Sequence, residues 1–260
     1  MKITITIDWK TAKTERRTPI IKVAEELGIK IPTLCYNEQL EPYGVCRLCT
    51  VEVVKGKRTR FVTACNYPVE EGLTIYTHSE KVMQIRRLII ESLLALCPDV
   101  KILQSLAKEL GVKELRFEKG KEDCIKCGLC VRMCEEIVGL SAISFADRGV
   151  DRKVITPFDL PSDICIGCGA CSFVCPTKSI KMELKAGDRF RSLPGNERFC
   201  RYAIMGIIPN ALCANSFRCW KCEVDQRFIE QLNTHPIFLS KKRKTKEVKD
   251  YITFLHKIRR

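Results

Sequence analysis

The chain has 260 residues, 45% of them hydrophobic, which is enough to bury sizeable cores in about one to three domains. Seventeen cysteines are typical of a secreted disulfide scaffold or a metal protein, and a net charge of +14 raises the question of nucleic-acid binding. Residues 1–20 contain no apolar run of signal-peptide length, and no segment is long and apolar enough to cross a membrane. We therefore expect a cytoplasmic protein whose reduced thiolates are free to bind metal.

Residues 1–76 are predicted to form a small mixed sheet with one helix. Residues 3–7 alternate as a half-buried strand, residues 20–28 are typical of a short amphipathic helix, and residues 50–62 form a hairpin turning at Gly56. Four thiolates with one close Cys-x2-Cys pair suit a [2Fe-2S] cluster, and a structural zinc ion is the alternative. The candidate ligands are Cys35, Cys46, Cys49 and Cys65, with x10, x2 and x15 between them.

Residues 77–115 are predicted to be a helical connector. Thr77 followed three residues later by Glu80 fits a capping box at the start of a long helix that Pro98 ends. A second helix, residues 101–110, ends at Gly111. The apolar positions expected to share one face of the long helix are Val82, Ile85, Ile89, Leu93 and Leu96.

Residues 116–185 contain a repeated Cys-x2-Cys-x2-Cys-x3-Cys motif, with a predicted hairpin across residues 147–149 between its copies. This spacing is that of bacterial ferredoxins, in which the fourth cysteine of each copy ligates the other cluster. One predicted [4Fe-4S] cluster is therefore held by Cys124, Cys127, Cys130 and Cys175. The other is held by Cys165, Cys168, Cys171 and Cys134. Zinc suits this spacing poorly, because its cysteine pairs are usually spaced differently.

Residues 186–230 contain a third cysteine group, and residues 231–260 form a basic tail. The group consists of Cys200, Cys213, Cys219 and Cys222, and either a further [4Fe-4S] cluster or a structural zinc ion accepts four thiolates. We expect the cluster, because the other cysteine groups of the chain are assigned to iron-sulfur clusters. Each [4Fe-4S] cluster with its thiolates carries about two negative charges, so the charge of the chain with its clusters is only modestly basic. We therefore expect the tail to be a solvated or partner-docking face and not a nucleic-acid arm.

Three runs of sequence resemble a known family. The segment IPTLCYNEQLEPYGVCRLCTVEVV and the motifs CIKCGLCVRMCEEIVG and CIGCGACSFVCPT are similar to the amino-terminal ferredoxin domains of the large iron-sulfur subunit of complex I. They are also similar to the small diaphorase subunit of NAD-reducing hydrogenases and to iron-only hydrogenases. The resemblance covers residues 1–185 and implies an electron wire between a flavin subunit, a catalytic metal subunit and ferredoxin.

This chain departs from the family pattern after the long helix. Many members carry a histidine and three cysteines there, which hold a further [4Fe-4S] cluster, whereas this chain has LLALCPDVKILQSLAKELGV. We therefore expect that cluster to be absent. Cys97, near the place of the histidine, is then most simply a buried core thiol.

The sequence contains none of the common catalytic or nucleotide-binding motifs: no phosphate-binding loop, no HExxH and no nucleophile elbow. We therefore predict a modular α+β iron-sulfur protein without catalytic residues of its own. It would relay single electrons between a flavin/NAD(P)- or ferredoxin-linked partner and a catalytic subunit, as in hydrogenase, formate dehydrogenase or aldehyde dehydrogenase complexes. The alternatives are an iron-sulfur redox sensor with a regulatory partner and a zinc-stapled interaction protein.

Overall fold

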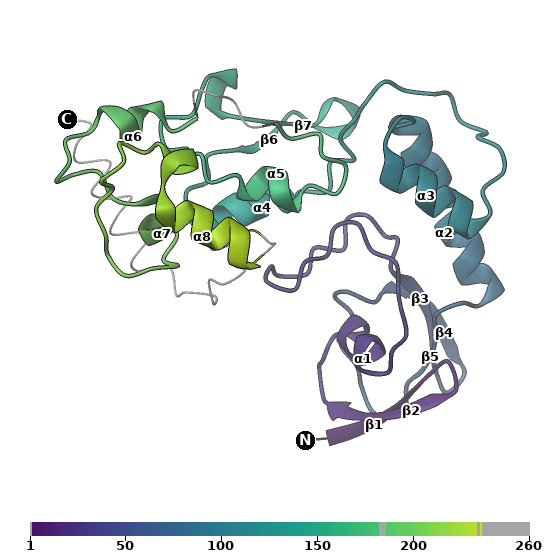
Figure 1. Ribbon diagram of the computed structural model, residues 1–260. Coiled ribbons are helices and arrows are strands. Elements are labelled where there is room, and N and C mark those ends of the chain that lie inside the picture. The colour runs from purple at the N-terminus through teal and green to yellow at the C-terminus, as the bar shows by residue number, and fades with distance from the viewer. Residues whose placement is uncertain (1, 182–185, 233–234, 236–260) are drawn as a thin grey trace. The chain divides into compact units, whose positions relative to one another are not determined.

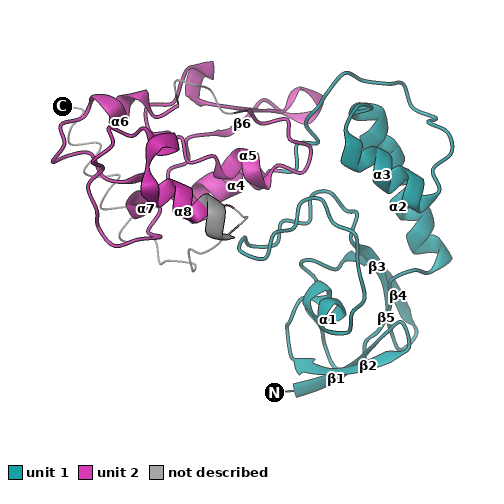
Figure 2. Ribbon diagram, in the orientation of Figure 1, with its two compact units in different colours: residues 1–127 teal, residues 128–260 magenta. Residues whose placement is uncertain are grey.

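The computed structural model describes residues 2–181, 186–232 and 235, and the chain divides into two compact units, residues 1–127 and 128–260 (Figures 1 and 2). Nearly all of the predicted basic tail lies outside the described residues. Among the helices of the described part, none combines the length and apolar character needed to span a bilayer.

The first unit begins with a five-stranded mixed sheet in the order β2-β1-β5-β3-β4. Its elements are β1 (Lys2–Ile7), β2 (Lys10–Glu15), α1 (Ile20–Glu26), β3 (Thr50–Lys55), β4 (Arg58–Thr63) and β5 (Thr74–Tyr76). β1 pairs parallel with β5, and the other neighbours pair antiparallel. The predicted first strand, first helix and hairpin at Gly56 are confirmed, whereas the sequence reasoning did not identify β2 and β5.

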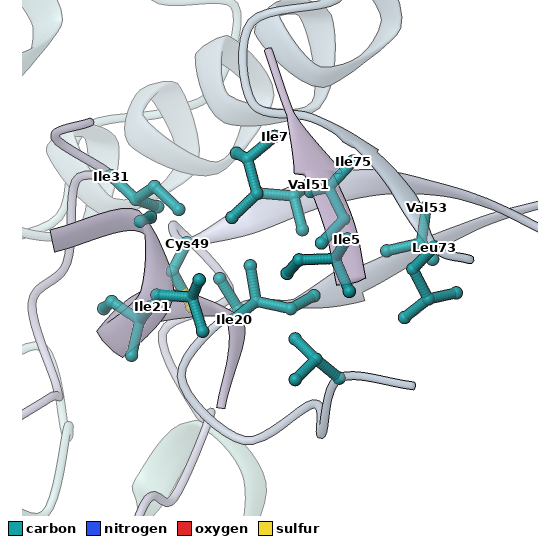
Figure 3. Close-up of a cluster of buried hydrophobic side chains, with 14 of the residues drawn as sticks. Ile5, Ile7, Ile20, Ile21, Ile31, Cys49, Val51, Val53, Leu73 and Ile75 are labelled. Carbon is teal, nitrogen blue, oxygen red and sulfur yellow. The ribbon is translucent and has the colours of Figure 1, made fainter. Parts of the chain in front are cut away.

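The core of this sheet forms because alternate residues of β1 point to one face, where α1 covers them. Ile5 from β1 packs with Ile20 from α1 and with Val51 and Ile75 from β3 and β5 (Figure 3). Full burial of each such side chain contributes about 1.5–3 kcal/mol. Cys49 belongs to the same buried cluster, so the first cysteine group is attached directly to the core.

Two helices follow the sheet, α2 (Glu80–Leu96) and α3 (Lys101–Leu110). The predicted capping box at Thr77 is wrong: Ser79 caps α2, its Oγ accepting a hydrogen bond from Val82 N at 3.4 Å. Thr77 instead donates its backbone N–H to Asp8 Oδ1 at 2.7 Å, which ties the linker to β1. The predicted ends of both helices are confirmed, with Gly111 left-handed at φ 73°.

In the residues that the structure describes, the second unit has short elements and little regular secondary structure. Its helices and turns are α4 (Leu129–Arg132), the π-helical turn η1 (Met133–Val138), the 3₁₀ turns η2 (Gly149–Asp151) and η3 (Pro157–Asp159), α5 (Ala170–Val174), α6 (Asp188–Ser192), α7 (Arg201–Ile204), the 3₁₀ turn η4 (Cys219–Lys221) and α8 (Glu223–Leu232). The predicted hairpin is formed by β6 (Ser144–Ala146) and β7 (Lys153–Ile155). Because strand pairing in the described part of this unit is short, the cysteine loops there are held mainly by their own packing and by side-chain contacts.

Candidate metal centres

The first cysteine group lies on loops and strand ends of the first unit. Cys35 follows α1, Cys46 and Cys49 lie on the loop leading into β3, and Cys65 follows β4. The structure brings them together as two pairs, with hydrogen bonds between the thiols of Cys35 and Cys46 and between those of Cys49 and Cys65. Two pairs of thiols match the two irons of a [2Fe-2S] cluster held by four cysteines, so this donor set fits the predicted group.

Hydrogen bonding within each pair favours a thiolate on one sulfur. The thiol of Cys35 lowers the pKa of Cys46 to about 6, and the thiol of Cys65 lowers the pKa of Cys49. The backbone N–H of Cys46 also donates to Sγ of Cys35 at 3.4 Å. The same hydrogen bonds raise the pKa of Cys35 and Cys65, so in each pair one sulfur is favoured as the thiolate, which is the form that binds metal.

A buried arginine supports this loop from α2. Arg86 is only 1% exposed, and its guanidinium donates from Nε to the carbonyl oxygen of Leu48 and from Nη2 to that of Thr50. These carbonyls flank Cys49, so the side chain fixes the backbone on both sides of a candidate ligand. The sequence reasoning missed Arg86 because it assigned a different face of α2 to the core; the most deeply buried stripe is Val82, Arg86 and Ile90.

The turn before Cys46 depends on a glycine. Gly44 has φ 69°, and a Cβ there would lie 2.9 Å from Nδ2 of Asn66. The Asn66 side chain is held by a hydrogen bond from Thr63 Oγ1, so it cannot easily move aside. The loop carrying Cys46 and the residue after Cys65 can therefore approach each other only because residue 44 has no side chain.

The two copies of the repeated cysteine motif adopt similar local structures. Gly128 and Gly169, both left-handed, precede α4 and α5, on which Cys130 and Cys171 lie. The fourth cysteines differ: Cys134 lies in the π-helical turn η1, whereas Cys175 ends α5. π-helical turns occur often at functional sites, where they redirect a side chain.

The structure brings Cys134 of the first copy together with three cysteines of the second copy. These four line one pocket, which we call the dicluster pocket; its lining is Cys134, Val138, Leu140, Ala142, Ile143, Cys165, Ile166, Cys168, Gly169, Ala170 and Cys171. Apart from the sulfurs, the side chains that line it are aliphatic. The four sulfurs are the donor set that the sequence assigned to one [4Fe-4S] cluster.

The chemistry of the dicluster pocket also fits a cationic metal core. Burial raises the pKa of Cys168 to about 12 and that of Cys171 to about 11, because a thiolate is costly in an apolar pocket without a compensating positive charge. The backbone N–H of Ala142 donates to Sγ of Cys134 at 3.3 Å. Hydrogen bonds of this kind stabilise sulfur-bound negative charge and help to set the potential of an iron-sulfur cluster.

The remaining cysteines of the repeat are Cys124, Cys127, Cys130 and Cys175. Sγ of Cys124 accepts a hydrogen bond from Lys126 N at 3.4 Å, and Sγ of Cys175 lies 3.5 Å from the hydroxyls of Thr177 and Ser179. The first two cysteines belong to one compact unit and the last two to the other. Their assignment to one cluster therefore stays a prediction.

The third cysteine group lies in the second unit. An antiparallel bridge between Phe199 and Leu212 aligns the neighbouring Cys200 and Cys213, whose backbone N–H groups donate to Ala211 O and Arg198 O. The turn η4 carries the other two cysteines at its ends. Cys200 interacts electrostatically with Cys213 and Cys222, and Cys219 with Cys200 and Cys213, so the four thiols lie in one region of the second unit.

Comparison with known families identifies two domains in the chain. Residues 1–80 match the family described as 2Fe-2S iron-sulfur cluster binding domain, and residues 120–182 match the 4Fe-4S dicluster domain. These matches confirm the predicted [2Fe-2S] and two-cluster ferredoxin regions. The third cysteine group lies outside both matched segments.

Related proteins are subunits of oxidoreductases. The chain is 34% identical over 217 residues to the NADPH-Fe(3+) oxidoreductase subunit alpha of Geobacter sulfurreducens, covering 74% of this chain and 25% of that protein. It is 33% identical over 205 residues to a component of the NADH-quinone oxidoreductase of Rhizobium meliloti, covering 68% of this chain and 24% of that protein. The chain thus spans about a quarter of the length of these curated relatives.

A solved structure of an NAD+-reducing [NiFe]-hydrogenase in the H2-reduced state is similar in fold as well as in sequence. The match has a TM-score of 0.53 and 26% identity, and it covers 59% of this chain and 74% of that chain. The resemblance predicted from the sequence is therefore confirmed, and these relatives favour an electron-transfer subunit over a redox sensor.

Proposed function

We propose that this chain, which combines a 2Fe-2S iron-sulfur cluster binding domain with a 4Fe-4S dicluster domain, relays single electrons within an oxidoreductase complex. The observation that carries the proposal is the dicluster pocket, where four cysteines from both copies of the repeat line an apolar cavity. Apolar, hydrogen-bonded cysteine sites suit one-electron chemistry, because they hold a cluster rigidly and exclude water from it.

The proposed ligands follow the cysteine groups. Cys35 and Cys46 would hold one iron of a [2Fe-2S] cluster, and Cys49 and Cys65 the other. The two [4Fe-4S] ligand sets would be Cys165, Cys168, Cys171 and Cys134, and Cys124, Cys127, Cys130 and Cys175. Each cluster, when bound, supplies a site that accepts and releases one electron.

The remaining side chains position the sulfurs and tune their surroundings. Arg86 holds the loop of Cys49 through two backbone carbonyls, and the N–H of Ala142 donates to Cys134. The aliphatic lining of the dicluster pocket, including Leu140 and Ile166, surrounds the sulfurs with apolar side chains. The described part of the chain contains no residues to which we assign a role in making or breaking substrate bonds.

The finer architecture of the proposal has five parts. They are a β-grasp [2Fe-2S] domain at residues 1–76, a helical connector at 77–115, a ferredoxin domain at 116–185, a four-cysteine module at 186–230 and a basic tail at 231–260. The partners would be a flavin/NAD(P)- or ferredoxin-linked subunit and a catalytic subunit of hydrogenase, formate dehydrogenase or aldehyde dehydrogenase type. The complex would work in the reducing cytoplasm, where thiolates stay available for iron.

The test is a redox titration of anaerobically purified chain, followed by metal analysis and low-temperature EPR. We expect at least about ten irons per chain, with matching acid-labile sulfide, from one [2Fe-2S] and two [4Fe-4S] clusters. Each cluster should take up one electron reversibly, and rapid-freeze samples mixed with limiting reduced viologen should show the electron passing between clusters. A colourless zinc protein, or clusters that stay oxidised in excess viologen, would overturn the proposal.

A further inference from the structure

The third cysteine group is built as a structured site. Its backbone bridge places Cys200 and Cys213 side by side, and the N–H of Phe217 donates to Sγ of Cys213 at 3.2 Å. Cys219 and Cys222 follow directly on η4, where Cys222 N donates to Cys219 O at 2.9 Å. The hydrogen bond from a backbone N–H to the sulfur of Cys213 has a counterpart in the dicluster pocket, where the N–H of Ala142 donates to Sγ of Cys134.

A buried network fixes the helices on which this group depends. The guanidinium of Arg201, the residue after Cys200, pairs with the carboxylate of Asp225 on α8, and the hydroxyl of Tyr202 donates to the same carboxylate. Asp225 and Tyr202 are each 3% exposed. Because α7 begins just after Cys200 and α8 just after Cys222, this network fixes the separation of the Cys200 and Cys222 sulfurs.

The same arginine reaches the dicluster pocket. Nη1 of Arg201 donates to the carbonyl oxygen of Gly167 at 3.2 Å, and Gly167 lies between Cys165 and Cys168. Arg201 also interacts electrostatically with Cys219. One positively charged side chain, about one-sixth exposed, therefore contacts the loop of one cysteine site and interacts electrostatically with a cysteine of the other.

The backbone is closely packed at the same boundary. A Cβ on Gly167 would lie 3.0 Å from the carbonyl oxygen of Ala186, which begins the third module. Nε2 of His235 lies 2.7 Å from the carbonyl oxygen of Cys168. The two cysteine sites are therefore neighbours within one compact unit. Arg201, the residue after Cys200, directly contacts the loop that carries Cys165 and Cys168.

The position of the third group favours a cluster over zinc. Either a structural zinc ion or a [4Fe-4S] cluster accepts four thiolates. The residue after Cys200 contacts the loop of the dicluster pocket, which lies in the segment that matches a 4Fe-4S dicluster domain. A cluster at this place could exchange electrons with its neighbour, whereas a zinc ion could not.

We propose that Cys200, Cys213, Cys219 and Cys222 hold a further [4Fe-4S] cluster that exchanges electrons with the cluster of the dicluster pocket, with Arg201 as the positioning residue between them. In each exchange one cluster is oxidised by one electron and the other is reduced by one. No bond or proton is transferred. The inference deepens the proposed function and rests on it, since it extends the same relay by one site.

The first test compares anaerobically purified full-length chain with the Cys219→Ser/Cys222→Ser variant. Wild type should contain about fourteen irons and no stoichiometric zinc, and the variant about ten, with acid-labile sulfide falling in parallel. Cys97→Ala is the matched control, because it removes a cysteine outside all four groups and should keep all the iron. About ten irons and about one zinc in wild type, with the zinc lost in the variant, would overturn the inference and leave the proposed function intact.

The second test measures whether the two clusters are neighbours. Fully reduced wild type should show EPR features of magnetic interaction beyond those between the two clusters of the ferredoxin domain, and the double variant should lose these additional features. In Arg201→Gln protein that retains the new cluster, the midpoint potential of that cluster should be more negative than in wild type, because a positive charge beside a negatively charged cluster is lost. The [2Fe-2S] midpoint should not move. Identical interaction features in wild type and the double variant, or an unchanged potential in Arg201→Gln, would contradict the proposed exchange.

Discussion

The guanidinium of Arg86 donates a hydrogen bond from Nε to the carbonyl oxygen of Leu48 at 3.1 Å, deep in the first unit. A second bond runs from Nη2 to the carbonyl oxygen of Thr50 at 2.8 Å. Burial lowers the pKa of Arg86 to about 10, which still leaves the side chain charged at neutral pH. A buried cation is retained here because it satisfies two backbone carbonyls beside Cys49 that no apolar side chain could satisfy.

Replacing Arg86 with Met should destabilise the first unit and loosen the proposed [2Fe-2S] site. Each carbonyl left buried without a partner costs about 1–3 kcal/mol. The visible circular dichroism of the cluster should disappear at a lower denaturant concentration than in wild type. Lys81→Met is the control, because it removes an exposed cation from the same helix. Equal midpoints for the two variants would show that the Arg86 bonds contribute nothing measurable.

Replacing Gly44 with Ala should reduce occupancy of the [2Fe-2S] site, because the new Cβ would meet Asn66 at 2.9 Å beside Cys65. Gly56→Ala provides a matched comparison: Gly56 has φ 58°, close to that of Gly44, but open space surrounds its Cβ position. Both variants therefore carry a similar backbone strain and differ in the clash. The integrated [2Fe-2S] EPR signal per chain should fall in Gly44→Ala and stay near the wild-type value in Gly56→Ala. An equal loss of signal in both variants would show that backbone strain, and not the contact with Asn66, causes the effect.

The cysteine spacing predicted much of the candidate site, because ligand spacing is a local property of the chain. The repeat motif placed Cys134 with the second copy, and the structure brings it into the pocket with Cys165. Arg86 and Arg201 were missed for the opposite reason. Each binds a loop more than thirty residues away in sequence, and only the fold brings each arginine to its loop. The capping box at Thr77 failed because Asp8, also distant in sequence, binds Thr77 instead.

The pair of Glu91 and Arg116 offers a pH test of how the segment after α3 is held. The hydrogen bond from the Arg116 guanidinium lowers the pKa of Glu91, and the backbone N–H of Arg116 donates to the same carboxylate at 2.7 Å. A carboxyl whose pKa is lower in the folded than in the unfolded chain stabilises the fold above its unfolded pKa, and this contribution is lost as pH falls through the folded value.

Glu91→Gln should therefore lower the thermal midpoint by the same amount at about pH 6 and at about pH 8, since the carboxyl is ionised throughout that range. The difference from wild type should narrow only below about pH 4.5. Far-ultraviolet circular dichroism of the helices reports both midpoints. Glu118→Gln changes an exposed carboxyl of the same segment and should leave the midpoint unaltered. A Glu91→Gln effect that changes between pH 6 and 8 would point to a different ionisable group.

Crossed ligation between the two copies of the repeat can be tested by combining cysteine replacements. Cys134→Ser should remove about four irons per chain by emptying the dicluster pocket, which Cys134 shares with Cys165. Adding Cys165→Ser should then remove little more, because both residues would serve one cluster. Adding Cys124→Ser to Cys134→Ser should remove about four further irons, because Cys124 would serve the other.

The same arithmetic applies to Cys175, whose partners the sequence assigns to the first copy. Cys175→Ser combined with Cys124→Ser should lose about as much iron and sulfide as either replacement alone, whereas Cys175→Ser combined with Cys165→Ser should lose about twice as much. Iron analysis and EPR of the anaerobic proteins measure both pairs. If the iron losses of Cys175→Ser and Cys165→Ser did not add, the two residues would serve the same cluster. Each copy of the motif would then bind its own cluster with its own fourth cysteine. The position of Cys134 in the dicluster pocket, with three cysteines of the other copy, favours the crossed arrangement.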